Sequence, residues 1–185
     1  MGPRVRGDDD LFRGTGSDPP MTPHLRAGAI AAIATLVIDQ ASKLWLLHVF
    51  DIAHRGAVRV TPFFDLVLAW NVGISFGWFQ TDNQLAQVAL MAIKAIAVIV
   101  LGIWMARSST LLATIALGLI IGGAVGNGID RFLHGAVVDF ALFHLDIGGK
   151  TYNWYVFNLA DVAIVAGVAG LLYDSFLGVP AAKAP

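Results

Sequence analysis

The stretch GGAVGNGIDRFLHGAVVDF, at residues 122–140, begins as an apolar helix-forming segment and ends in charge. Glycine recurs every four positions from Gly118 to Gly126, a spacing of small residues that lets membrane helices approach closely. Asn127 and Arg131 follow four positions apart, so they share one face of a helix. Charged side chains at the rim of a membrane segment are costly in free energy, and we interpret them as candidates for function.

The composition of the 185-residue chain is that of a membrane protein. Hydrophobic residues make up 57% and charged residues 14% of the chain, whereas a soluble domain carries about 25% charged residues. A net charge of −1 gives no reason to expect a nucleic-acid partner. The absence of cysteine excludes disulfides, a thiolate nucleophile and a zinc–thiolate site. Every acidic residue is Asp, so any carboxyl chemistry must use Asp.

Four apolar runs are each long enough to cross a bilayer, which takes about 20 helical residues. We predict an all-α membrane protein, a four-transmembrane-helix bundle over residues 25–179 with a small extracytoplasmic β-rich cap and an interfacial segment. The predicted spans are about 25–49, 85–106, 111–132 and 156–179, and the predicted outer loops are 50–84 and 133–155. We expect a disordered polar tail at 1–24, with Met21 as a candidate start, and a short C-terminal tail at 180–185.

The distribution of basic residues orients the predicted bundle. Arg4, Arg6 and Arg13 precede the first span and Arg26 stands at its start, while Arg107 lies between the second and third spans and Lys183 follows the fourth. By the positive-inside rule these ends face the cytoplasm, so both termini are expected there and the two longer loops outside. Apolar and polar residues partly alternate at 59–71 in the first of these loops, which predicts a short strand at the membrane surface.

Several polar residues are predicted to meet at the outer surface, and each has two interpretations. Asp39 and Lys43, four positions apart, form either a rim ion pair with Lys43 reaching the lipid headgroups or a pair that borders a site. Asn158 and Asp161 have the spacing of helix N-cap and N3 residues, and the same geometry directs the Asp161 carboxylate to the outer mouth of the bundle. Arg131 either anchors a helix end to lipid phosphate or holds a carboxylate through a bidentate contact.

Asp139, in the sequence GAVVDF, is a second carboxylate that apolar neighbours would hold at the bilayer rim. Two carboxylates held together share a proton, because both cannot readily ionise. One then acts as base on a water while the protonated one polarises a scissile carbonyl, chemistry that needs no metal or cofactor. A proton relay in a small proton-coupled transporter would use the same ingredients, so the spacing alone leaves both functions open.

Five motifs, in order and in register, resemble the lipoprotein signal peptidase (signal peptidase II) family of bacterial intramembrane aspartic proteases. They are DQASK at 39–43, NVGISF at 71–76, GGAVGNGIDR at 122–131, GAVVDF at 135–140 and FNLAD at 157–161. The resemblance implies that Asp139 and Asp161 are the catalytic pair. It further implies supporting roles for Asp39, Lys43, Asn71, Gly73, Asn127, Arg131 and Asn158.

The resemblance also implies a substrate and a location. The expected substrates are diacylglyceryl-modified prolipoproteins, which the enzyme would cut just before the lipidated Cys to release the signal peptide. We expect a monomeric multi-pass protein of the bacterial inner membrane, in contact with membrane lipids, with its active site near the outer face. No metal, cofactor or nucleic acid is expected to take part.

Overall fold

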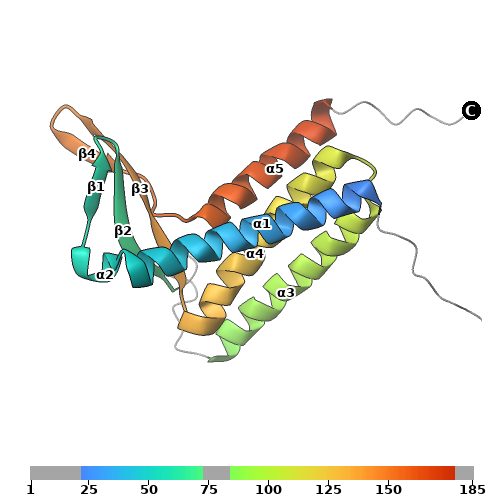
Figure 1. Cartoon of the computed structure of the whole chain (residues 1–185), viewed down its shortest axis with the longest axis horizontal. Helices are drawn as coiled ribbons and strands as arrows, with labels where there is room; N and C mark the ends of the chain where they lie inside the picture. Colours follow the sequence, from blue (N-terminus) through green and yellow to red (C-terminus); the bar gives the residue numbers. More distant parts are fainter. Residues whose placement is uncertain (1–21, 73–83, 178–185) are drawn as a thin grey trace, which may run out of the picture.

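A computed structural model describes residues 22–72 and 84–177 of the chain. The long helices of Figure 1 are α1 (Pro23–Leu44), α3 (Gln84–Arg107), α4 (Leu111–His134) and α5 (Leu159–Leu177). A π-helical turn, η1 (Trp45–Val49), continues α1, and the short helix α2 (Ile52–Arg55) follows it. The strands are β1 (Val58–Thr61), β2 (Phe64–Asn71), β3 (Val137–Ile147) and β4 (Lys150–Asn153).

The strands form one antiparallel sheet in the order β1-β2-β3-β4. The sheet stands at the end of the bundle where α1 finishes and α5 begins (Figure 1). The strand predicted within 59–71 is confirmed and belongs to a hairpin of β1 and β2. For the predicted outer loop at 133–155 no strand was predicted, and the structure places β3 and β4 there. Residues 136–141 are buried, so the first half of β3 lies inside the protein.

Each of the four predicted spans coincides with a long helix of the structure, but three helices of the described residues, and not four, are long and apolar enough to cross a membrane. Among the described residues, the helices long and apolar enough to cross a membrane are Pro23–Val49, Leu111–His134 and Leu159–Phe176. The predicted span at 85–106 corresponds to α3. The last helix begins at Leu159 and not at 156, because Phe157 forms a β-bridge with Ala141 and extends the chain there.

Helix α4 is the centre of the bundle and packs against α1, α3 and α5. The glycine spacing from Gly118 to Gly126 is confirmed as its close contact with α1. A Cβ atom at Gly122 would overlap the backbone carbonyl of Ala32, and one at Gly126 would overlap the carboxylate of Asp39. Both positions therefore favour glycine, because an added side chain would meet the α1 backbone at Gly122 and the buried Asp39 carboxylate at Gly126.

Replacing Gly122 by Ala should destabilise the protein, because the new Cβ overlaps the Ala32 carbonyl. We expect a cost of about 1–3 kcal/mol, as for other overpacked cores, measured as a lower unfolding temperature in detergent. Gly128→Ala is the matched control, since no atom lies within 4 Å of its Cβ position on the same helix. Ala is favoured over Gly in helices by about 1 kcal/mol, so equal unfolding temperatures for the two variants would contradict this packing.

Candidate functional site

A cluster of buried polar side chains lies where the helices meet the sheet. Its most buried members are at most 3% exposed: Asp39, Lys43, Asp130, Asp139 and Asn158. They come from α1, α4, β3 and the residue just before α5, so the fold gathers segments far apart in the sequence. Buried polar groups are stable only when they are hydrogen-bonded, and the contacts within this cluster satisfy that requirement.

Asn158 joins the two candidate catalytic carboxylates. Its Nδ2 donates hydrogen bonds to Asp139 Oδ1 at 2.6 Å and to Asn127 Oδ1 at 3.0 Å. Its backbone N donates to Asp161 Oδ2 at 3.3 Å, and its Oδ1 accepts from the backbone N of Asp161 at 3.0 Å. This reciprocal pair is a capping box, so the predicted capping of the last helix is confirmed. The residue that caps α5 is also the one that holds Asp139.

Asn127 fixes the second carboxylate from the central helix. Its Nδ2 donates to Asp161 Oδ1 at 2.8 Å, while its Oδ1 accepts from Lys43 Nζ at 3.1 Å and from Asn158. Both carboxylate oxygens of Asp161 are therefore hydrogen-bonded, one from α4 and one from the start of its own helix. These contacts hold Asp161 in one orientation beside Asn158.

Asp139 lies on β3 and is held from two sides. Asn71 on β2 donates its Nδ2 to Asp139 Oδ2 at 3.1 Å, and Asn158 donates to the other oxygen. Burial raises the pKa of Asp139 above its usual value, and the negative charge of Asp161 raises it further. The hydrogen bonds from Asn71 and Asn158 and the charge of Lys43 oppose this change without cancelling it. Asp139 therefore retains its proton to a higher pH than an ordinary Asp.

Lys43 is a buried cation between two carboxylates. Its Nζ lies 2.8 Å from Asp39 Oδ2 and 2.7 Å from Asp130 Oδ2. The predicted pairing of Asp39 with Lys43 is confirmed, but the alternative in which Lys43 reaches the headgroups is wrong. The lysine is 2% exposed, because the second carboxylate and Asn127 draw its amine into the protein.

Asp130 is a member of this cluster that the sequence analysis did not include. Its Oδ2 accepts a hydrogen bond from the backbone N of Val138 at 3.1 Å, and its Oδ1 accepts from Gln40 Nε2 at 2.9 Å. The signal was present in the spacing, since position 130 continues the series of residues from Gly118 to Gly126 that faces α1. Asp130 thereby holds the backbone residue directly before Asp139.

Asp39 holds the backbone at the start of α5 in the same way as Asp130 holds the backbone of β3. Its Oδ1 accepts a hydrogen bond from the backbone N of Ala160 at 3.0 Å, while its other oxygen contacts Lys43. Ala160 directly precedes Asp161 and is fully buried. The two carboxylates that Lys43 pairs with thus each hold the residue before a candidate catalytic Asp.

Two of the predicted supporting residues differ from the rest. Gly73 lies outside the described residues. Arg131 is half-buried, and its Nε has no hydrogen-bond partner in the described part of the chain. The ion pairs among residues 22–72 and 84–177 do not include a bidentate contact from Arg131 to a carboxylate.

Lys43→Met should destabilise the protein strongly, because it leaves Asp39 and Asp130 buried without their counter-charge. Breaking a buried ion pair by removing one partner costs about 3–5 kcal/mol, whereas replacing all partners by neutral groups is often nearly neutral. The triple variant Lys43→Met, Asp39→Asn, Asp130→Asn should therefore unfold at a higher temperature than Lys43→Met alone. Thermal unfolding in detergent tests this order, and a triple variant less stable than Lys43→Met would contradict it.

Comparison with known proteins places this geometry in context. Residues 31–177 match a protein family described as Signal peptidase (SPase) II. A lipoprotein signal peptidase of Nitrobacter hamburgensis is 75% identical over 165 residues, which cover 89% of this chain and 100% of that protein. One from Rhodopseudomonas palustris is 66% identical over the same length and with the same coverage.

A solved structure has a similar fold. It is described as a bacterial membrane enzyme determined by the in meso method, and it matches with a TM-score of 0.68 and 25% sequence identity. The match covers 83% of this chain and 95% of that one. The similarity therefore extends over most of both chains.

Proposed function

The chain belongs to the signal peptidase II family and is an aspartic protease of prolipoproteins, in which we propose that Asp139 and Asp161 form the catalytic pair. One observation carries this assignment: the side chain and backbone of Asn158 contact both carboxylates. An aspartic protease needs two carboxyl groups that share one proton, and a common hydrogen-bonding residue keeps them together. Membership in the family also sets aside the proton-coupled transporter.

In the proposed reaction Asp139 carries the shared proton and Asp161 is the base. Asp161 removes a proton from a water, whose oxygen attacks the carbonyl carbon before the lipidated Cys, while Asp139 donates its proton toward the carbonyl oxygen. As the tetrahedral intermediate collapses and the C–N bond breaks, Asp161 gives the proton it took from water to the leaving nitrogen, and the oxygen returns its proton to Asp139. The raised pKa of Asp139 supports its role as the acid. The supporting residues then position these groups through the contacts described above.

Arg131 is proposed to act on the substrate and not on the resting pair. Its Nε is buried without a hydrogen-bond partner among the described residues, although a buried donor normally has one. A peptide carbonyl of bound substrate would satisfy this donor. Gly73 keeps the supporting role implied by the family resemblance.

The proposed topology has four spans, α1, α3, α4 and α5, with both termini in the cytoplasm and the sheet as a cap over the outer face of the bacterial inner membrane. Several apolar side chains of α1 support lipid contact, since Ile30, Ile33 and Val37 are 58–67% exposed. The diacylglyceryl group of the substrate would lie in the same lipid layer. A monomer suffices for catalysis, because one chain supplies both carboxylates.

Asp139→Asn and Asp161→Asn should each abolish cleavage of a diacylglyceryl-modified prolipoprotein, measured as a gel shift in detergent without added metal. Loss of a general acid or base reduces rates by about 10²–10⁴-fold. Asp146→Asn is a matched control, since Asp146 is an exposed residue of β3 that bonds only Thr151 in the described residues. Full activity of either catalytic variant would refute the pair, and inhibition of the wild type by a chelator would point to a metallopeptidase.

The raised pKa of Asp139 predicts how stability depends on pH. A carboxyl whose pKa is higher in the folded than in the unfolded state stabilises the fold when protonated, and this contribution is lost as pH rises through the folded-state pKa. Asp139→Asn is neutral throughout, so its advantage in unfolding temperature over the wild type should grow as pH rises. Thermal unfolding of both proteins from about pH 4 to about pH 8 measures this difference. An advantage that grows on acidification would contradict the shift.

A further inference from the structure

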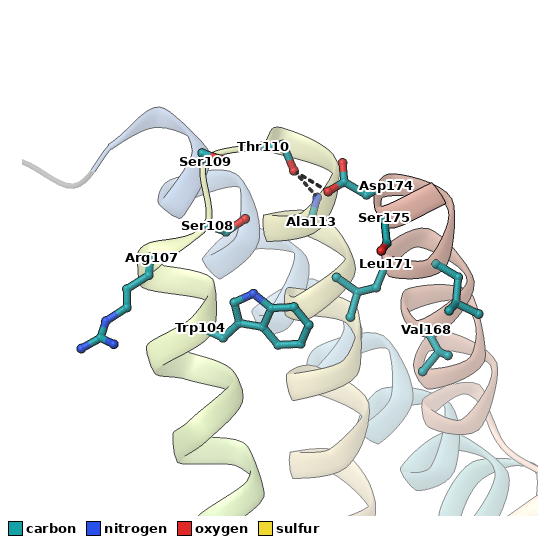
Figure 2. A pocket seen from close by; sticks show the side chains of 11 residues that line it. Trp104, Arg107, Ser108, Ser109, Thr110, Ala113, Val168, Leu171, Asp174 and Ser175 are labelled. Carbon is teal, nitrogen blue, oxygen red and sulfur yellow. Dashed lines mark hydrogen bonds between the residues drawn. The ribbon is translucent and has the colours of Figure 1, made fainter. Parts of the chain in front are cut away.

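A cavity lies at the end of the bundle opposite the two catalytic carboxylates. Its volume is about 610 Å³, and it lies between the end of α3 and the end of α5, with the start of α4 beside both. Figure 2 shows Trp104 from α3 and Val168 and Leu171 from α5 around it, with Asp174 at its upper edge. The cavity therefore combines an apolar wall with hydroxyl groups and one carboxylate, and Arg107 also contributes to its lining.

One face of α5 connects this cavity to the catalytic pair. Asp161, Val165, Val168 and Leu172 follow at intervals of three and four residues, so they lie along the same side of the helix. The three apolar members are 69%, 44% and 52% exposed, and Val168 and Leu172 also line the cavity. An unpartnered apolar stripe thus begins at Asp161 and ends in the cavity.

The length of this stripe fits the substrate of the proposed reaction. Asp161 and Ser175 are 14 positions apart, which is about 21 Å along a helix that rises about 1.5 Å per residue. The apolar region of a signal peptide has about 7–15 residues and follows a positively charged N-terminal region. A helical signal peptide with its cleavage site at Asp161 would therefore bring that basic region to the cavity.

The charge at the cavity is complementary to such a peptide. Asp174 accepts a hydrogen bond from Thr110 Oγ1 at 3.1 Å and retains acceptor capacity for a cation. It lies in the last turn of α5, where the helix dipole also favours positive charge. Thr110 caps the start of α4 by accepting from the backbone N of Ala113. Arg107 also lines the cavity, and its guanidinium extends away from Asp174 (Figure 2). Asp174 is thus the one carboxylate among the residues that line the cavity.

We propose that this cavity binds the positively charged N-terminal region of the prolipoprotein signal peptide, with Asp174 as its counter-charge. The proposal rests on the proposed function, because it takes the prolipoprotein as substrate and Asp161 as the position of the scissile bond. It assigns substrate selection to the end of the bundle remote from the chemistry.

Two synthetic diacylglyceryl-modified prolipopeptides test the proposal, identical except that one has Lys and the other Gln in the N-terminal region. Cleavage by the full chain in detergent gives the ratio of their kcat/KM values. An exposed ion pair contributes about two- to fivefold, so we expect the wild type to favour the Lys peptide by that factor, mainly through KM. Added salt should reduce the preference.

Asp174→Asn should bring the ratio to about one with kcat unchanged, since the amide oxygen still accepts from Thr110 but has no charge. Asp174→Lys should favour a peptide with Glu in the same region, a gain that a folding defect would not produce. Asp146→Asn is the matched control, because Asp146 also accepts from a threonine, Thr151, at 2.6 Å but lies on the sheet. It should leave the wild-type ratio unchanged.

The experiment distinguishes failure of this proposal from failure of the proposed function. An equal ratio in wild type and Asp174→Asn, with both peptides cleaved, would overturn the proposal and leave the proposed function intact. The same loss of preference in Asp146→Asn would also overturn it, because the effect would then be a general one of surface charge. Failure of the wild type to cleave either peptide would overturn the proposed function and this proposal together.

Discussion

The geometry of the active site depends on one buried lysine. Lys43 lies within 2.8 Å of a carboxylate of its own helix and of one on α4. Each of these carboxylates also accepts a backbone N–H from the residue directly before a proposed catalytic Asp, at Ala160 and at Val138. Removing three charged groups from water is costly, and their attraction repays that cost only with good geometry and further hydrogen bonds. Here those further bonds determine where the catalytic backbone lies.

This arrangement requires helices α1 and α4 to be unusually close. The Asp39 carboxylate occupies the place that a Cβ at Gly126 would fill, so the ion cluster forms only because that residue has no side chain. The same helix carries Asn127 to the neighbouring face, where it contacts both Lys43 and Asp161. The close packing of α1 against α4 and the positions of the polar groups therefore depend on the same face of α4 and on the adjacent face that carries Asn127.

Local patterns in the sequence predicted several contacts of this site. They failed where the outcome depended on how deeply a side chain is buried or on which distant residue it contacts. Helical spacing was sufficient for the Asp39–Lys43 pair, the capping box of Asn158 and the glycine contact, because each depends on residues one helical turn apart. Spacing does not say how deep a side chain lies, so Lys43 was placed at the headgroups as one alternative. Strand β3 lacks an alternating pattern because residues 137–141 are all buried, so apolar side chains on either side of Asp139 face both ways. Asp130 was missed because its partner lies on another helix.

The capping box at the start of α5 has a consequence for inhibition. Asp161, the proposed catalytic base, is also the N3 residue of its helix, and the residue that caps this helix also holds Asp139, the proposed acid. Exchange of Asn158 or Asp161 would weaken a helix start, where a cap contributes about 0.5–2 kcal/mol, in addition to disturbing the proposed catalytic pair. A compound that binds through these groups would therefore meet a target with little freedom to mutate, and resistance would have to arise elsewhere on the chain.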